Sequence, residues 1–150
     1  MQVVIAVAIS AALCTSAFTQ AKFGTADEAK AMLAKAIAAV KADKAKALEM
    51  FNKGGGGFLD RDIYPFCINF SDGKILATQA KQALGVDVRT LKDAAGRNFG
   101  QEGYDAAMKL KEGEEFRFML PRPGADKTPV QKVAFLMKAG DFYCGVGYYK

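Results

Sequence analysis

The chain contains no histidine among its 150 residues. This absence excludes Ser-His-Asp and Cys-His catalysis, haem attachment through a C-x-x-C-H motif, and metal sites built on histidine. Only carboxylates, lysines and arginines are left as groups for chemistry. The sequence therefore predicts neither a metal site nor a cofactor.

Charge is also absent from the first 21 residues. An apolar run, Val3 to Leu13, is followed there by small residues at Thr15–Ala17 and at Ala21, which resembles a secretory signal peptide. The run is shorter than the roughly 20 apolar residues that span a bilayer. We therefore predict a signal peptide over residues 1–21 and one periplasmic or secreted domain over residues 22–150, with no stable membrane anchor. The alternative is an N-terminal helix that the mature protein keeps.

Cysteine is scarce, and removal of the leader leaves only Cys67 and Cys144. An even number of cysteines in an oxidising compartment permits a disulfide. Two buried thiols are the alternative, because both neighbourhoods are apolar. The spacing of the pair fits no zinc pattern.

The net charge of +5 favours anions in general and does not indicate a nucleic-acid partner.

The segment Ala26 to Phe51 is rich in Ala, Lys, Leu and Met, which favours a helix. Thr25 and Glu28 have the spacing of a capping box at its start. Four glycines, Gly54–Gly57, cannot continue a helix and end it. The sequence predicts one long N-terminal helix, with one face packed on a sheet.

Larger side chains occupy every second position from Tyr64 to Phe70, the period of a β-strand. A turn at Ser71–Gly73 and a short strand at Ile75–Ala77 complete a hairpin. A helical crossover over Gln79–Lys111 follows. Three further strands are expected after it, at Glu114–Leu120, Val130–Lys138 and Phe142–Tyr149. The predicted fold class is α+β, with a long N-terminal helix, a five-stranded antiparallel sheet and a helical crossover after strand two.

Residues 25 to 150 resemble a single Cache domain, the extracytoplasmic relative of PAS domains that forms the sensing module of bacterial receptors and kinases. No single motif is a signature, and the order and spacing of five segments carry the resemblance. These segments are Gly57–Phe66, Asp72–Ala77, Pro121–Gly124, Lys132–Phe135 and Gly145–Tyr149.

The resemblance implies a PAS-like sheet in strand order 2-1-5-4-3. Cys67 and Cys144 would then lie on neighbouring strands, which favours a disulfide because bridged cysteines need Cα atoms within about 7 Å. The chain stops at Lys150 without a following transmembrane helix, so it resembles the freestanding exported form. Such a protein would bind a small molecule and present it, buffer it, or report it through a partner such as a membrane receptor or kinase.

In Cache domains the ligand lies between the sheet and the crossover. The resemblance implies apolar walls at Tyr64, Phe66, Phe118 and Leu120, and polar contacts at Gln79, Arg122 and Lys132. Relatives carry an aromatic residue at the position of Leu120 and a histidine near Gln79, and these departures argue against recognition of an amine by an aromatic cage.

Lys132 and Arg122 favour a carboxylate ligand instead. Lys132 lies in an otherwise apolar strand, so it needs a partner if it faces inward. The alternatives are that Phe118 and Leu120 are plain core and that Arg122 is a solvated loop residue.

The sequence thus predicts a non-enzymatic periplasmic binding domain of the sensor type, for a small organic acid. One alternative is an enzyme that uses Asp60, Asp62 or Glu102 with Lys132 as acid and base. Another is a structural or protein-interacting domain whose own side chains fill the pocket.

Overall fold

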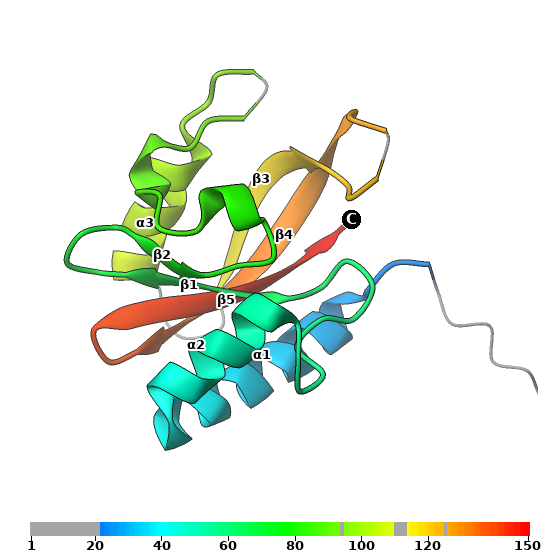
Figure 1. The fold of residues 1–150 in the computed structure, drawn as a ribbon. Helices are drawn as coiled ribbons and strands as arrows, with labels where there is room; N and C mark the ends of the chain where they lie inside the picture. Colours follow the sequence, from blue (N-terminus) through cyan, green and yellow to red (C-terminus); the bar gives the residue numbers. More distant parts are fainter. Residues whose placement is uncertain (1–21, 94, 110–113, 125) are drawn as a thin grey trace, which may run out of the picture.

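The computed structural model describes residues 22–93, 95–109, 114–124 and 126–150, so the predicted signal peptide lies outside the described residues. A five-stranded antiparallel sheet in the order β2-β1-β5-β4-β3 forms the middle layer (Figure 1). Helices α1 and α2 cover one face of this sheet, and α3 and the segment before it cover the other. The strands are β1 (Pro65–Asn69), β2 (Ile75–Ala77), β3 (Glu115–Pro121), β4 (Pro129–Ala139) and β5 (Phe142–Tyr149).

The predicted α+β class and strand order are confirmed, because β1 and β5 pair side by side as the PAS-like order requires. The predicted strand bounds agree with the observed ones to within about one residue. The β1–β2 hairpin closes where Gly73 adopts a φ of 71°, a conformation that glycine takes without steric cost.

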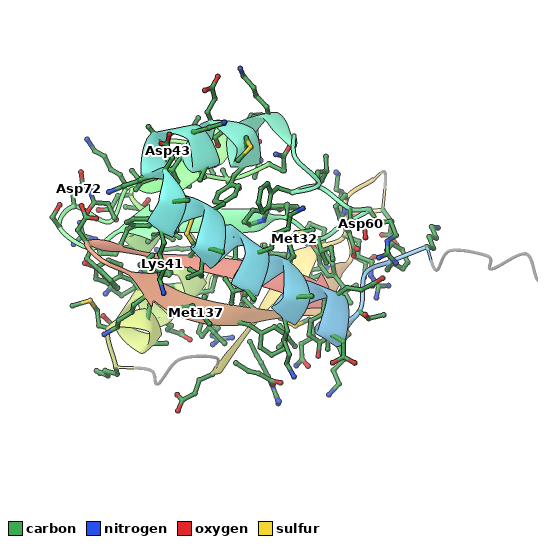
Figure 2. The ribbon with its side chains drawn as sticks, turned by 90° about the horizontal axis from the view of Figure 1, so that it is seen from below. Met32, Lys41, Asp43, Asp60, Asp72 and Met137 are labelled. Atoms are coloured by element: carbon green, nitrogen blue, oxygen red, sulfur yellow. A yellow bond between two sulfur atoms is a disulfide. The ribbon has the colours of Figure 1, made fainter. Side chains whose placement is uncertain are left out.

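The N-terminal helical segment is divided in two, which corrects the prediction of one long helix. Helix α1 spans Ala26–Ala42 and α2 spans Lys44–Lys53. Asp43 between them is extended at φ −157°, and its carboxylate accepts a hydrogen bond from the Lys46 amide at 3.0 Å. It therefore caps α2 while its own amide closes α1, at the bend labelled in Figure 2.

The start and end of this helical segment follow the prediction. Thr25 and Glu28 form the capping box, with the Glu28 carboxylate accepting from the Thr25 amide at 2.8 Å. Gly54 ends α2 in the left-handed conformation at φ 68°.

The crossover after β2 contains two short 3-10 turns, Lys81–Ala83 and Val88–Thr90, and helix α3 at Phe99–Lys109. Helix α3 lies inside the predicted crossover, and its small residues explain its close packing. A Cβ added at Gly100 would collide with the carbonyl oxygen of Val88. Glycine at this position lets α3 pack directly on the second turn.

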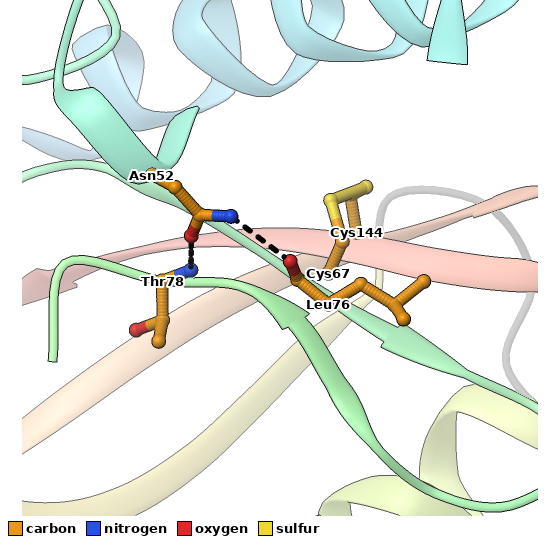
Figure 3. Close-up of a disulfide and its surroundings, with 5 residues drawn as sticks. All are labelled: Asn52, Cys67, Leu76, Thr78 and Cys144. Carbon is orange, nitrogen blue, oxygen red and sulfur yellow. Dashed lines mark hydrogen bonds between the residues drawn. A yellow bond between two sulfur atoms is a disulfide. The ribbon is translucent and has the colours of Figure 1, made fainter. Parts of the chain in front are cut away.

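Two apolar cores lie on opposite faces of the sheet. The core beneath α1 and α2 contains the disulfide between Cys67 and Cys144, which face each other across β1 and β5 with Cα atoms 4.0 Å apart (Figure 3). Both cysteines are fully buried. The second core lies between the sheet and the crossover, around Ile68, Phe118 and Leu136.

Across the described ranges, no helix has the length and apolar character needed to cross a membrane.

Candidate functional site

A partly open cavity of about 140 Å³ lies between the sheet and the crossover. Aliphatic and aromatic side chains form most of its wall. The sheet contributes Tyr64, Phe66, Ile68, Ile75, Phe116, Phe118, Leu120, Lys132, Leu136 and Tyr143, and the crossover contributes Thr78, Ala80, Ala83, Val88, Leu91, Phe99, Gly100 and Gly103. Lys132 is the one charged residue among these lining residues.

Two glycines of β5 make room on the floor of this cavity. A Cβ at Gly147 would lie 2.7 Å from Cε of Lys132, so the lysine stem runs across β5 at this point. Gly145 lies against the ring of Phe66 in the same way, and a Cβ there would also come within 2.7 Å of Leu136. Glycine weakens a central strand but allows such a close approach. The paired glycines thus leave room over β5 for a β4 lysine and a β1 phenylalanine.

The aromatic wall is built from stacked rings on β3 and α3. The rings of Phe99 and Phe118 stack with centroids 5.2 Å apart, and those of Phe116 and Phe118 lie 5.5 Å apart. Gly103 of α3 lies directly over Phe116, where a Cβ would come within 2.9 Å of the ring. This apolar wall stands on β3, at the edge of the sheet opposite β2, so it lies away from Phe66 on β1.

Lys132 is only 4% exposed. Its Nζ lies 4.9 Å from the centre of the Tyr64 ring and 4.6 Å from that of Tyr149. Within the described part of the chain, no group accepts a hydrogen bond from this ammonium and no carboxylate pairs with it. Burial lowers the pKa of Lys132 to about 8, and the charge of Asp62 opposes that change only in part. The cavity therefore holds a cation whose hydrogen bonds are unused.

Asp62 is the acidic residue that acts on Lys132, and it is also buried, at 4% exposure. Its Oδ1 accepts a hydrogen bond from the Gly24 amide at 2.6 Å, whereas its Oδ2 has no hydrogen-bond partner in the described structure. Asp62 does not line the cavity. A molecule inside the cavity can therefore contact Lys132 directly, whereas it cannot contact the carboxylate of Asp62.

Tyr64 and Tyr149 flank the lysine, and Tyr143 lines the same cavity. Burial raises the pKa of Tyr64 and of Tyr143, and it raises that of Tyr149 to about 12. The Tyr149 hydroxyl donates to the carbonyl of Pro121 at 2.8 Å. All three side chains are therefore neutral at physiological pH, and the tyrosines add polar hydroxyls without adding charge.

Five of the seven residues predicted to bind a ligand line this cavity: Tyr64, Phe66, Phe118, Leu120 and Lys132. The other two lie elsewhere. The amide of Gln79 is directed toward α2, where it donates to the carbonyl of Phe51. The guanidinium of Arg122 lies over the ring of Phe23 at 4.4 Å, and it donates to the carbonyl of Lys150 at 3.3 Å.

The carboxylates weighed as catalytic groups do not gather around Lys132. Asp60 pairs with Arg61 at 2.7 Å, and Glu102 pairs with Arg97 on the solvent side of α3. Asp60 and Asp62 do not share a strand, because Arg61 between them adopts a φ of 56°. Only Asp62 lies close enough to influence the lysine. Across the described residues, no three His, Cys, Asp or Glu side chains come together as a metal site.

Tyr143, Tyr149 and Gly147 are parts of the site that the sequence reasoning did not single out. Alternation along β5 could have found all of them, because Tyr143, Gly145, Gly147 and Tyr149 fall on the face opposite Cys144. Thr78 and Phe99 carry no such signal, since they lie outside regular strands.

No family model matches this chain, and no curated protein matches it in sequence. Solved structures do match. A methyl-accepting chemotaxis protein from Vibrio parahaemolyticus superposes with a TM-score of 0.63 at 21% identity, over 82% of this chain and 86% of the other. The periplasmic sensor domain of a chemotaxis protein gives 0.60 at 18%, over 82% and 88%. A Cache chemosensory domain described for carboxylic acid recognition gives 0.59 at 20%, over 82% and 86%.

These likenesses establish the fold. The chain has the fold of the Cache and periplasmic chemosensory sensor domains, as the resemblance in sequence implied. In that fold, the cavity described above lies between the five-stranded sheet and the crossover.

Proposed function

We propose that this chain is an exported sensor-type domain that binds a small monocarboxylate in the cavity beside Lys132. The observation that carries the proposal is the buried ammonium of Lys132, which faces an otherwise apolar cavity with no accepting group among the described residues. A buried charge without a partner is costly. A carboxylate in the cavity would supply both the opposite charge and the missing hydrogen-bond acceptors.

The rest of the cavity favours a short apolar tail. Its wall is built from Phe66, Phe118 and Leu120, which offer dispersion contacts and no hydrogen bonds. A cavity of about 150 Å³ in another protein holds benzene, which has six heavy atoms. The volume here, about 140 Å³, therefore suits a monocarboxylate of about six heavy atoms. The apolar wall disfavours a dicarboxylate, whose second charge would be buried without a partner.

The comparisons support a sensor role without naming the ligand. Two of the similar structures are chemotaxis proteins, and the third is described for carboxylic acid recognition. The proposed ligand agrees with the latter in chemical class. A membrane receptor or kinase is the proposed partner that reads the bound state.

Export to the periplasm or the medium is part of the proposal. The buried Cys67–Cys144 disulfide supports it, because such bonds form and persist in oxidising compartments. The apolar, uncharged start of the sequence supports it as well.

Binding without turnover fits the site better than catalysis does. Among the residues that the structure describes, Lys132 has one carboxylate, Asp62, close enough to act on it, and Asp62 does not line the cavity. General acid–base catalysis needs a donor or acceptor within hydrogen-bond reach of the reacting atoms, directly or through one water. We therefore propose a non-enzymatic role.

Thermal denaturation with a ligand panel tests the proposal. The panel runs from acetate to hexanoate with branched isomers, and each acid is matched with its amide and its amine. A stabilising monocarboxylate whose amide and amine have no effect is the expected result. Lys132→Met should abolish the response while it keeps the volume of the side chain. Stabilisation by amines, or an equal response in Lys132→Met, would contradict the proposal, and a response to no acid at all would favour a structural domain.

A further inference from the structure

We propose that Lys132 also captures small aldehydes and ketones, by forming a reversible imine with them inside the cavity. The inference concerns the same cavity as the proposed function and rests on its being accessible to small molecules. It differs in the chemistry, because the neutral amine rather than the ammonium is the reacting form.

The geometry isolates the amine as a nucleophile. Its stem is held across Gly147, and its Nζ lies between the faces of the Tyr64 and Tyr149 rings. Across the described ranges no acceptor holds the nitrogen, so loss of its proton breaks no hydrogen bond within the protein. Lysines that form imines in other proteins are activated by this kind of desolvation in an apolar pocket.

The charged and titratable groups near the amine leave it partly neutral near pH 8. Asp62 lies in the loop before β1, Tyr64 precedes β1, and Tyr149 ends β5. The charge of Asp62 favours the protonated form, and so do the faces of the two tyrosine rings. Burial outweighs Asp62 and brings the pKa of Lys132 to about 8. About half of Lys132 is therefore neutral at pH 8, against about one in 300 of a lysine with the ordinary pKa of 10.5.

The reaction balances without an oxidant, a reductant or a cofactor. The nitrogen lone pair attacks the carbonyl carbon, an N–C bond forms, and the π pair of the carbonyl moves to oxygen. One proton passes from nitrogen to that oxygen to give a carbinolamine. The nitrogen lone pair then forms the C=N double bond as the C–O bond breaks, the second proton of the nitrogen passes to the departing hydroxide, and the products are an imine and one water molecule. An apolar wall around the amine favours the side of this equilibrium from which water has left.

The volume of the cavity sets the size of the carbonyl compound. About six heavy atoms fit, by the same comparison as for the carboxylate. Short aldehydes and ketones such as isobutyraldehyde and butanone fall within this limit. Pyridoxal exceeds it and provides a matched probe that reaches exposed lysines only.

Reductive trapping tests the inference on the whole chain. The protein is treated with isobutyraldehyde and sodium cyanoborohydride over a range of pH, and the modified lysines are located by peptide mass mapping. We expect Lys132 to be alkylated at least tenfold faster at pH 8 than Lys74, whose side chain is 60% exposed. Alkylation of Lys132 should level off above about pH 8, whereas that of free Nα-acetyl-lysine, which has the ordinary lysine pKa, should keep rising beyond that pH.

The reactions with pyridoxal and at Lys74 serve as references for the trapping at Lys132. Pyridoxal should modify Lys74 and leave Lys132 untouched. Alkylation of Lys132 at pH 8 no faster than that of Lys74, or a rate at Lys132 that keeps rising beyond pH 9, would overturn the inference. Monocarboxylate binding without trapping would overturn the imine alone and leave the proposed function standing. Trapping at Lys132 without carboxylate binding would overturn the proposed function and leave the imine standing.

Discussion

The side chain of Lys132 crosses β5 at Gly147, where a Cβ would come within 2.7 Å of the lysine Cε. This contact explains how a β4 lysine reaches the ring of Tyr64, which precedes β1 on the far side of β5. A glycine in a central strand sacrifices packing and strand propensity. Here the missing side chain of Gly147 leaves room for Lys132, the one charged side chain among the described residues that line the cavity.

Gly147→Ala should displace Lys132 and weaken binding of the monocarboxylate. The new methyl group would meet the lysine Cε at 2.7 Å and the Val133 carbonyl oxygen at 3.3 Å, so one of them must move. Overpacking of this kind costs about 1–3 kcal/mol. Urea denaturation measures the loss of stability, and calorimetry measures the loss of affinity.

A double-mutant cycle with Lys132→Ala isolates this contact. Alanine at position 132 removes the Cε atom, so Gly147→Ala should cost clearly less in that background. Equal costs in both backgrounds would show that the lysine does not lie across the glycine.

Lys132→Met should stabilise the unliganded protein near neutral pH. Burial holds the pKa of Lys132 at about 8 instead of its ordinary 10.5, and this difference corresponds to about 3 kcal/mol spent on burying the charge. Methionine fills a similar volume without that charge. Chemical denaturation of both proteins at about pH 7 gives the comparison, and a large loss of stability in Lys132→Met would contradict it.

The stability difference between these two proteins should shrink as the pH rises. Between about pH 8 and 10.5 the unfolded wild-type chain binds more protons at position 132 than the folded one, so the wild type gains stability with rising pH in this window. The expected slope is about 1.4 kcal/mol per pH unit. The raised pKa of Tyr149, at about 12, acts in the opposite direction above about pH 10, but it is shared by both proteins and cancels in the difference.

The Cys67→Ala/Cys144→Ala double variant should lose about 4 kcal/mol of stability. The disulfide joins residues 77 positions apart, and a loop of that length restricts the unfolded chain strongly. Because both cysteines are fully buried, the native protein should resist dithiothreitol until it unfolds. Free-thiol titration follows the reduction. Rapid reduction by dithiothreitol under native conditions would contradict this burial.

Asn52→Leu should loosen the edge strand β2. The Asn52 amide donates to the Leu76 carbonyl at 3.1 Å and accepts from the Thr78 amide at 3.0 Å, on either side of Ala77 (Figure 3). Leucine has a similar shape and can do neither, which leaves two backbone groups unpaired at a cost of about 1–3 kcal/mol. Hydrogen exchange should rise at Thr78, which lines the cavity, and should stay unchanged in α3. Asn52→Asp, which keeps the acceptor, should restore part of the protection at Thr78.

The sheet could be predicted from the sequence because strand alternation is a local signal. Phe116, Phe118 and Leu120 repeat at every second position, and the same holds from Tyr64 to Phe70. The break at Asp43 has no such signal. Neither glycine nor proline marks it, and alanines and lysines continue on both sides. The helix ends there because the Asp43 carboxylate caps α2, and this choice depends on how α1 and α2 pack on the sheet.

The residues of the candidate site were predictable where they belong to strands and unpredictable where they lie in loops. Phe66 and Lys132 were predictable because their positions in strands fix the face that they occupy. Tyr64 was predictable because it continues the alternation of β1 one residue before the strand starts. Gln79 and Arg122 follow a strand end in loop-like sequence, where no period fixes a side chain. Local contacts direct them away from the cavity, to the carbonyl of Phe51 and to the ring of Phe23.

The most direct test of the central claim is the pKa of Lys132 itself, measured by NMR on protein labelled with ¹³C at lysine Cε. Without ligand, we expect one lysine to titrate near pH 8, and this resonance should be absent from Lys132→Met. A saturating monocarboxylate should raise that pKa toward its ordinary value, because the bound anion favours the ammonium, and the matched amide should leave it unchanged. A Lys132 pKa that no acid from acetate to hexanoate shifts would contradict the account.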